Sequence, residues 1–410
     1  MNLIIYLALF TFLFFIEKGY IWIARKYNVE DNPGARSSHN VITVRGGGII
    51  FYVAMLAYFV YAGFSYPYFF LGLTILSFIS FVDDLHSLSP KTRLVCQMLA
   101  MALMALQVST SSIGIMLLIL IMSTGVVNVI NFMDGINGML CGVSLVSLGT
   151  LLYIDYEIIC FIDPEMIWAI FIADVAFCCF NFKERAECFA GDVGSMSMGY
   201  ILFYLVIKLI WKSNNIGWVM LLLPFLVDGF LTIGHRIILR ENILLPHRKH
   251  AYEIMANELR IPHIAVSLIY MSIQAVCILL FIWKPTLVTA SIEASTLIVA
   301  YVAFKGKYYP LHVASRINSK EIAFQESKTV MIIGPHNKIQ RYKETIHLQT
   351  DQRNETIDID SWDEGLIIKY KPECIYLLDY SYLLDHEISD LIEVCKKNHV
   401  SHLILETNIQ

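Results

Sequence analysis

Residues 112–138 read SIGIMLLILIMSTGVVNVINFMDGING, a long apolar run that ends in a polar cluster. The apolar part has the length of about 20 residues that an α-helix needs to cross the hydrocarbon core of a bilayer. Asn128, Asn131 and Asp134 are spaced three residues apart, so they lie on one side of a helix. Gly135 follows, where the backbone can come close to a ligand. The stretch therefore predicts a membrane helix with a polar site at one end.

Apolar runs of similar length recur along the chain as far as residue 304. They lie at 3–23, 47–66, 68–85, 92–109, 112–132, 138–155, 165–182, 194–212, 216–239, 262–283 and 286–304. Charged residues make up only 16% of the chain, whereas a soluble domain usually has about 25%. The predicted fold class is an all-α polytopic membrane protein with eleven transmembrane helices. The first run lacks a basic region and a cleavage site, so we expect it to be a retained helix and not a signal peptide.

Basic residues are concentrated in every second connection between these runs. They are Arg25, Lys26, Arg36, Arg45, Lys91, Arg93, Lys183, Arg185, Arg236, Arg240, Arg248, Lys249, Arg260, Lys305 and Lys307. The opposite connections hold little beyond Lys212 and Lys284. Because loops rich in Lys and Arg stay in the cytoplasm, the N-terminus is predicted to lie outside and the C-terminus in the cytoplasm.

The composition changes after Tyr309, where the chain becomes charged. Strand-like runs lie at 329–333, 374–378 and 402–405, with a helical pattern at 387–397. This pattern predicts a transmembrane domain over residues 1–310 and a small cytoplasmic α/β domain over residues 320–410. The α/β part has Gly334 after its first strand but no GxGxxG, so it has no nucleotide-binding fingerprint.

Five polar clusters interrupt the apolar pattern, and each falls at a helix end or loop on the predicted cytoplasmic side. They are DNPGARSSH at 31–39 with RGGG at 45–48, Asp83-Asp84, Asn128 with Asn131 and Asp134, Asn181 with FAGDVGS at 189–195, and Asp228 with PHRKHAY at 246–252. Ionisable residues at membrane depth cost about 3 kcal/mol each and usually mark function. Their shared side predicts one cytoplasmic site.

The residue types in these clusters suit chemistry on phosphate. Gly191 and Gly194 surround Asp192 where a helix is expected to begin, and exposed N–H groups at a helix start favour phosphate. Carboxylates and amides beside phosphate suit Mg²⁺, which prefers oxygen ligands. The cationic, donor-rich segment from His247 to His250 suits phosphate oxygens as well.

Each cluster taken alone also has a structural explanation. The aspartate pair is compatible with a solvated helix end, and the glycine run with close helix packing. The row of asparagines is compatible with hydrogen bonds between membrane helices. The histidines, and the first cluster, are compatible with contacts at the membrane interface. Only the joint occurrence of all five on one side favours a shared site.

Taken together, the clusters resemble the polyprenyl-phosphate N-acetylhexosamine-1-phosphate transferases of glycosyltransferase family 4, over about residues 25–253. The combination of RSSH at 36–39, RGGG at 45–48 and HRKHAY at 247–252 looks closest to the branch that starts O-antigen or capsule units. That branch often takes UDP-N-acetylated sugars. The chain is less similar to the peptidoglycan branch, which uses UDP-MurNAc-pentapeptide.

The resemblance implies transfer of a sugar-1-phosphate from a UDP-sugar to undecaprenyl phosphate, with release of UMP. Catalytic or phosphate-site roles are implied for Asp83, Asp84, Asn131 and Asp134. We expect substrate-binding roles for Arg36, His39, Arg45, Asn128, Asn181, Phe189, His247, Arg248 and His250, with Phe189 stacking on uracil. A Mg²⁺ ligand is implied at Asp192, with Mn²⁺ as the alternative metal.

The expected partners are the UDP-sugar, the polyprenyl phosphate and the membrane lipids, without nucleic acid, and a homodimer is left open. The expected location is the cytoplasmic (inner) membrane, with the active site and the C-terminus facing the cytoplasm. The sequence departs from the family pattern in a few places. Residues 41–44 read VITV where prolines are usual, Arg185 stands where Pro is common, His235 stands where Arg is common, and Glu253 replaces a frequent Gln.

A membrane transporter is the rival interpretation, because transporters also carry Asp and Asn within the membrane. A transporter usually places these residues near the bilayer midplane and often has inverted repeats. Here the polar clusters lie at predicted helix ends, and no internal repeat is visible in the sequence. The pattern therefore favours the transferase.

Overall fold

The computed structural model describes residues 3–31, 41–86, 88–108, 112–241, 243, 247–326, 329–334, 339, 355–359, 363–378, 390–391, 393–395, 397–398, 400 and 402–406. The chain forms two units. The first comprises Met1–Thr232 and His247–Lys307, and the second comprises Ile233–Pro246 and Tyr308–Gln410. We describe each unit by itself.

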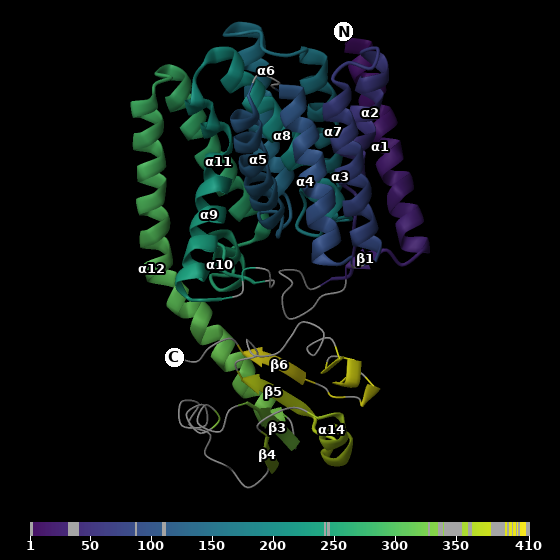
Figure 1. The fold of residues 1–410 in the computed structure, drawn as a ribbon, viewed down its shortest axis with the longest axis vertical. Helices are drawn as coiled ribbons and strands as arrows, with labels where there is room; N and C mark the ends of the chain where they lie inside the picture. Colours follow the sequence, from purple (N-terminus) through teal and green to yellow (C-terminus); the bar gives the residue numbers. More distant parts are fainter. Residues whose placement is uncertain are drawn as a thin grey trace. The chain divides into compact units, whose positions relative to one another are not determined.

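The helices of the chain follow the apolar runs of the sequence (Figure 1). They are α1 (Leu3–Lys26), α2 (Ile49–Tyr61), α3 (Pro67–Leu85), α4 (Pro90–Val108), α5 (Ile113–Phe132), α6 (Met139–Glu157), α7 (Pro164–Asn181), α8 (Gly191–Ser213), the 3-10 helix η1 (Ile216–Leu222) leading into α9 (Leu223–Ile238), α10 (Ala251–Asn257), α11 (His263–Trp283) and α12 (Leu287–Glu326). Each of the eleven predicted runs therefore contains one helical segment, and the short helix α10 was not predicted. The predicted fold class, a polytopic all-α membrane protein, is confirmed.

Nine helical stretches within the described part of the chain are long and apolar enough to cross a membrane. The two predicted helices outside this set are α2 and α4. Helix α2 has only 13 residues, and α4 begins with Pro90-Lys91-Thr92-Arg93, which makes its first turn polar.

Helix α8 lies in the middle of the membrane unit (Figure 1), and 83% of its most apolar window is buried. It packs against α3 and α5. Tyr200 on α8 donates hydrogen bonds to the carbonyl oxygens of Phe69 at 3.2 Å and Ala100 at 3.3 Å. The hydroxyls of Ser77 and Ser197 lie 2.7 Å apart. Small and hydroxyl-bearing residues are typical of close contacts between membrane helices. Helix α8, which carries Asp192 in its first turn, is therefore held in place by its neighbours.

The glycine run before α2 packs directly against the start of α8. Gly48 N–H donates to the carbonyl of Ala190 at 3.0 Å, and Gly47 N–H donates to that of Phe189 at 2.9 Å. A Cβ on Gly48 would overlap the Cα of Gly194. The structure thus shows close helix packing at this glycine run, which was one of the two interpretations that the sequence allowed. It places the neighbouring Arg45 beside α8.

A short two-stranded ribbon comes before this glycine run. Strand β1 (Glu30–Asp31) pairs antiparallel with β2 (Thr43–Val44). Val44 also forms a parallel bridge with Cys188. The segment before α2 and the segment before α8 are therefore held together on both sides of Arg45.

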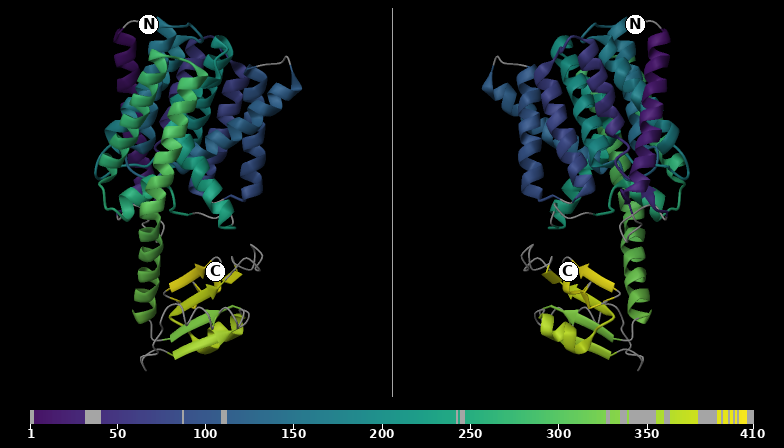
Figure 2. Two further views of the ribbon diagram at one scale, coloured as in Figure 1. Left: turned by 90° about the vertical axis from the view of Figure 1, so that its left-hand side faces the viewer. Right: turned by 90° about the vertical axis from the view of Figure 1, so that its right-hand side faces the viewer.

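The second unit contains a four-stranded parallel sheet with the order β4-β3-β5-β6, and its strands lie side by side in both views of Figure 2. The strands are β3 (Thr329–Ile333), β4 (Glu355–Ile359), β5 (Cys374–Leu378) and β6 (His402–Glu406), with α14 (Glu364–Tyr370) between β4 and β5. Three of the four strands match predicted runs, and β4 was not predicted.

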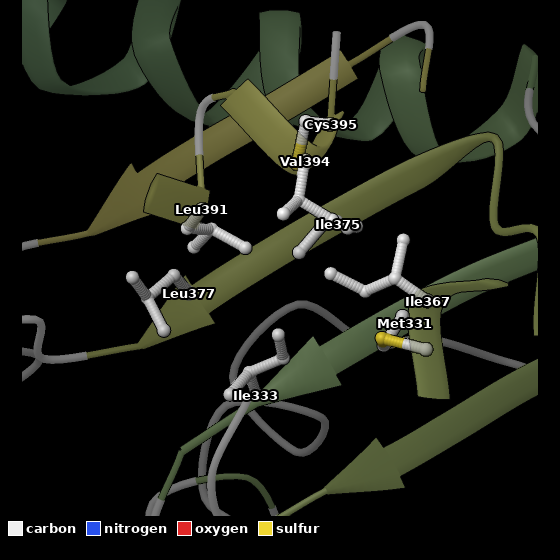
Figure 3. Close-up of a cluster of buried hydrophobic side chains, with 8 residues drawn as sticks. All are labelled: Met331, Ile333, Ile367, Ile375, Leu377, Leu391, Val394 and Cys395. Atoms are coloured by element: carbon white, nitrogen blue, oxygen red, sulfur yellow. The ribbon is translucent and has the colours of Figure 1, made fainter. Parts of the chain in front are cut away.

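One face of this sheet carries an apolar core (Figure 3). Its buried members are Met331, Ile333, Ile367, Ile375, Leu377, Leu391, Val394 and Cys395. The strand residues among them alternate along β3 and β5, as expected for one face of a sheet. Helix α12 continues to Glu326, so the chain is still helical at residue 320, where the sequence predicts the α/β domain to begin.

Candidate active site

Three aspartates from two helices meet between two arginines. Asp84, in the last turn of α3, forms an ion pair with Arg45, whose Nε lies 2.6 Å from Asp84 Oδ1. The same guanidinium reaches Asp192 Oδ1 at 3.4 Å. On the other side, Arg93 lies 2.8 Å from Asp83 Oδ2 and 3.3 Å from Asp192 Oδ2. Asp192 is therefore flanked by two guanidinium groups, and the structure brings together four of the residues that the sequence assigns to the site, which are Asp83, Asp84, Asp192 and Arg45.

These aspartates differ in how much of their surface is open. The side chain of Asp84 is 1% exposed, that of Asp83 is 8% exposed, and that of Asp192 is 19% exposed. Both oxygens of Asp84 accept hydrogen bonds from the first turn of α8, from Asp192 N–H at 3.0 Å and Val193 N–H at 2.9 Å. Asp192 is thus the carboxylate with the most room for a ligand.

The arginines compensate the negative charge. Burial lowers the pKa of Arg45, but the carboxylates of Asp84 and Asp192 outweigh it and leave the pKa above its ordinary value. Arg45 is therefore a permanent cation in the site. Gly191, just before Asp192, has a φ of +70°, and a Cβ there would lie 2.5 Å from Asp84 Oδ2. Only glycine allows α8 to begin this close to Asp84.

The sequence analysis did not assign Arg93 to the site. It used this residue only to predict the orientation of the chain in the membrane. A signal was available. Arg93 lies in the first turn of α4, where the helix dipole disfavours a cation. A basic residue at such a position is stabilised by a nearby carboxylate, and Asp83 supplies one across the turn between α3 and α4.

The polar end of α5 contributes to the same region. Ser195 on α8 donates a hydrogen bond to Asn131 Oδ1 at 2.5 Å, which joins α5 to the start of α8. Asp134 follows α5, and burial together with the negative charges of Asp192 and Asp84 raises the pKa of its carboxyl well above the usual range. Asn128 donates within its own helix, to the carbonyl of Thr124 at 2.8 Å.

Asn181 is buried, and both ends of its amide are used inside the protein. Its oxygen accepts the N–H of Gly138 at 2.8 Å, and its Nδ2 donates to the carbonyl of Cys188 at 2.9 Å. This amide joins the end of α7 to the start of α6 and to the segment before α8. The half-buried Phe189 belongs to that segment, and its N–H donates to the carbonyl of Val44 at 2.8 Å. Nucleotide contacts at Asn181 and Phe189 stay predictions. The hydrogen bond from Asn181 to Cys188 holds the segment that carries Phe189.

The segment from His247 to His250, called the histidine loop below, is organised by Asp228 on α9, a residue that is only 2% exposed. Its oxygens accept from the Tyr270 hydroxyl at 2.6 Å and from the Ala251 N–H at 3.0 Å. His250 Nδ1 lies 3.2 Å from Asp228 Oδ1. A carboxylate accepts hydrogen bonds, so this contact places a proton on Nδ1. The start of α10 and the ring of His250 are therefore fixed by one buried carboxylate.

The histidine loop lies against the end of α5. The rings of His247 and His250 are 4.9 Å apart, and each lies 6.4 Å from the ring of Phe132. Tyr252 donates to the carbonyl of Phe132 at 2.8 Å, and a Cβ on Gly135 would overlap the Tyr252 hydroxyl. The loop is therefore adjacent to the segment that carries Asp134.

Two predicted site residues, Arg36 and His39, lie outside the described residues. Arg248 is half-buried within the histidine loop. In the described part of the chain, the structure thus joins four of the five polar clusters directly, through the contacts of Arg45, Asp84, Asp192 and Asn131. It places the fifth, the histidine loop, next to the end of α5.

Part of the chain is similar to a family of known proteins. Residues 66–210 match the model of the family named Glycosyl transferase family 4, a stretch that holds Asp83, Asp84, Asp134 and Asp192 as well as Arg93. A probable undecaprenyl-phosphate N-acetylglucosaminyl 1-phosphate transferase of Bacillus subtilis is 24% identical over 255 residues, covering 56% of this chain and 70% of the relative.

Two undecaprenyl-phosphate alpha-N-acetylglucosaminyl 1-phosphate transferases are similar as well. The protein of Thermotoga maritima is 25% identical over 255 residues, which cover 60% of this chain and 79% of the relative. The protein of Escherichia coli K12 is 28% identical over 233 residues, which cover 50% of this chain and 61% of the relative. Over residues 66–210 the chain is thus similar to glycosyl transferase family 4, and these relatives are N-acetylglucosaminyl 1-phosphate transferases.

Proposed function

We propose that the chain transfers a sugar-1-phosphate, that of an N-acetylated hexosamine, from a UDP-sugar to undecaprenyl phosphate, with release of UMP. The observation that carries this proposal is the position of Asp192 between Arg45 and Arg93 at the start of α8. Such a site offers anionic oxygen ligands for a cation beside guanidinium donors for phosphate. The named relatives act on undecaprenyl phosphate. The reaction would be the first membrane step of O-antigen or capsule synthesis.

The reaction forms one P–O bond and breaks another. An oxygen of the lipid phosphate attacks the sugar-linked phosphorus of the UDP-sugar, and UMP departs with the electron pair of the broken bond. The second pKa of a phosphate monoester is about 6, so at neutral pH the attacking phosphate is already mostly dianionic. The site therefore needs to position the reactants and to neutralise charge more than it needs a strong base.

The described residues fit a Mg²⁺ site. Asp84 has both oxygens committed to backbone N–H groups. Asp192 has its oxygens in longer contacts with the guanidinium groups, at 3.4 and 3.3 Å, and its side chain also interacts with that of Asp83. Asp192 would hold the ion, with Asp83 as the nearest second carboxylate, and Mn²⁺ is the alternative metal. When bound, the ion would neutralise charge on the diphosphate and on the departing UMP.

The side chains around Asp192 then have separate tasks. Arg45 and Arg93 hold the carboxylates in place and offer N–H groups to phosphate oxygens. Asp83 is anchored by Arg93 and by the Leu88 N–H at 2.7 Å, which suits orientation of the lipid phosphate better than free proton transfer. Arg248, between His247 and His250, would offer further N–H groups to phosphate oxygens.

The positions of the carboxylates argue against the transporter interpretation. Asp83 and Asp84 lie in the last turn of α3, Asp192 lies in the first turn of α8, and Asp134 follows the end of α5. A transporter would place its ion or substrate site near the bilayer midplane. We further infer that the protein lies in the cytoplasmic membrane with this site on the cytoplasmic side.

The test is release of UMP by the purified protein in detergent, supplied with undecaprenyl phosphate and a panel of UDP-sugars, with and without Mg²⁺. We expect UMP only with the lipid phosphate present, only with divalent metal, and with a preference for UDP-N-acetylhexosamines. A folded preparation that releases no UMP from any UDP-sugar on the panel would contradict the proposed function.

A further inference from the structure

A second group of side chains that can bind a metal lies in the histidine loop and the first turn of α10, and it does not include the aspartates around Asp192. His247, His250 and Glu253 each bring one nitrogen or oxygen atom to within 4.8 Å of the others. His250 and Glu253 are buried, and His247 is half-buried. Two imidazoles and one carboxylate form a different donor set from the oxygen-rich site of the aspartates.

The ring of His250 is prepared to accept a ligand at one nitrogen. Its Nδ1 lies 3.2 Å from Asp228 Oδ1 and donates to this carboxylate, so Nε2 is the ring nitrogen left for a ligand. His250 is 2% exposed, and its Nε2 has no hydrogen-bond partner among the described residues. A metal-bound histidine almost always donates its other ring N–H to a carboxylate or carbonyl, as His250 does here.

Glu253 supplies a charge that its local structural task does not need. Its Oε2 accepts the N–H of His250 at 3.0 Å, which closes the first turn of α10. Glu and Gln serve equally in this capping arrangement. A carboxylate is a common ligand of zinc. Glu253 therefore converts a pair of histidines into a three-ligand set.

We propose that His247, His250 and Glu253 form a binding site for a borderline divalent cation of the Zn²⁺ class. Imidazole nitrogens with one carboxylate are a donor set typical of zinc, with bonds of about 2.0–2.2 Å. Ligands of a tetrahedral ion with such bonds lie about 3.4 Å apart. The three side chains therefore approach one another by small rotations when the ion binds, and Asp228 holds His250 in place.

Occupancy of this site has a consequence for the transferase, and this step rests on the proposed function. A cation bound to His247 and His250 withdraws both rings from the substrate. Zn²⁺ should therefore inhibit UMP release, whereas Mg²⁺ at Asp192 should support it. The two metals act at different sites because their preferred donors differ.

The first experiment measures binding without any substrate. The full chain in detergent is freed of metal with a chelator, and Zn²⁺ is titrated by calorimetry, with Co²⁺ absorption as the second readout. We expect one tight site per chain and the visible bands of tetrahedral Co²⁺. The Glu253→Gln variant should bind at least about tenfold more weakly, because the amide keeps the cap but not the charge. The control is Glu184→Gln, which changes an exposed carboxylate and should bind like the parent.

A His247→Gln variant removes a second ligand and should weaken binding as well. Thermal unfolding establishes that each variant is folded before its titration is interpreted. Absence of a tight site in the parent, or equal Zn²⁺ affinity in folded Glu253→Gln and parent, would overturn the site. In a separate assay, Zn²⁺ should inhibit UMP release by the parent more strongly than by Glu253→Gln. If the parent releases no UMP, the proposed function fails while the titrations still decide the cation site.

Discussion

The carboxylate of Asp84, at the end of α3, accepts the backbone N–H of Asp192, in the first turn of α8, at 3.0 Å. Its other oxygen accepts the N–H of Val193 at 2.9 Å. The first N–H groups of a helix lack partners within the helix, and a carboxylate there also interacts favourably with the helix dipole. Asp84 therefore positions Asp192, while its neighbour Asp83 faces Arg93. Two adjacent aspartates thus have different tasks.

The first prediction concerns Asp192. An amide keeps the size of the carboxylate but removes its negative charge, and Mg²⁺ is held by few protein ligands. Asp192→Asn should lower turnover by about 100-fold or more and sharply weaken the dependence of activity on Mg²⁺, without unfolding the protein. The measurement is UMP release against Mg²⁺ concentration.

The matched comparison is Asp83→Asn, which should slow turnover but largely keep the affinity for Mg²⁺. Asp83 is held by Arg93 and by a backbone N–H, so its charge serves mainly to orient neighbouring groups. If Asp192→Asn bound Mg²⁺ and UDP-sugar like the parent while Asp83→Asn did not, the metal ligand would be Asp83.

The second prediction concerns Arg93, which bridges Asp83 and Asp192. Arg93→Met leaves both carboxylates without this cation and removes donors from the phosphate site, so kcat/KM should fall by about 100-fold. Arg93→Lys should recover part of the loss, because lysine keeps the charge but lacks the planar fork.

The control for Arg93 is Lys91→Met, because Lys91 is an exposed basic residue in the same first turn of α4. It should retain the activity of the parent. Equal losses in Lys91→Met and Arg93→Met would mean that the general charge of this turn matters and that the contacts of Arg93 do not.

Much of the fold could be predicted because one physical requirement dominates it. Each membrane crossing needs a long apolar run, and such a run is visible without knowledge of its neighbours. Helix α10 was missed because it has only seven residues and begins at N–H groups held by Asp228, which lies far away in the sequence. Strand β4 was missed because ETIDI mixes polar and apolar residues, as an edge strand of a sheet can.

The sequence predicted that several of these residues lie close together, but it missed Arg93 and did not predict which contacts each aspartate makes. Spacing and shared side brought Asp83, Asp84 and Asp192 together. Which aspartate caps α8 depends on the angle at which two helices meet, and no local pattern encodes it. The same is true of Asn181, whose amide looks available in the sequence but is occupied by backbone groups on both sides.

The third prediction concerns the glycine contact between α2 and α8. A Cβ on Gly48 would overlap the Cα of Gly194, so Gly48→Ala should force the two helices apart, at a cost of about 1–3 kcal/mol. We expect a lower unfolding temperature and a loss of activity. The control is Gly19→Ala in α1, where a Cβ would meet nothing within 4 Å. If Gly48→Ala unfolded at the temperature of Gly19→Ala, this contact would not constrain the site.

The fourth prediction concerns the C-terminal unit. All residues assigned to the site lie before residue 254, so the sheet of β3 to β6 should be dispensable for the chemistry. Helix α12 runs to Glu326, and a truncation after that residue removes the sheet without cutting the helix. The truncated protein should release UMP in detergent at a rate close to that of the full chain. Complete loss of turnover in a well-folded truncation would make the sheet part of the site.

The fifth prediction concerns orientation. Pro164 and Asn181 are the two ends of α7, so the segments before and after this helix should lie on opposite sides of the membrane, with the basic segment after it in the cytoplasm.

The exposed thiol of Cys160 is a natural reporter for the segment before α7. In a background that lacks the other exposed cysteine, Cys179, an impermeant maleimide should label Cys160 on intact cells. Lys183→Cys, and a cysteine placed at Ser89 or His247, should react only after the cells are made permeable. Labelling of Cys160 and Lys183→Cys from the same side would contradict a membrane-spanning α7 and, with it, the cytoplasmic position of the site.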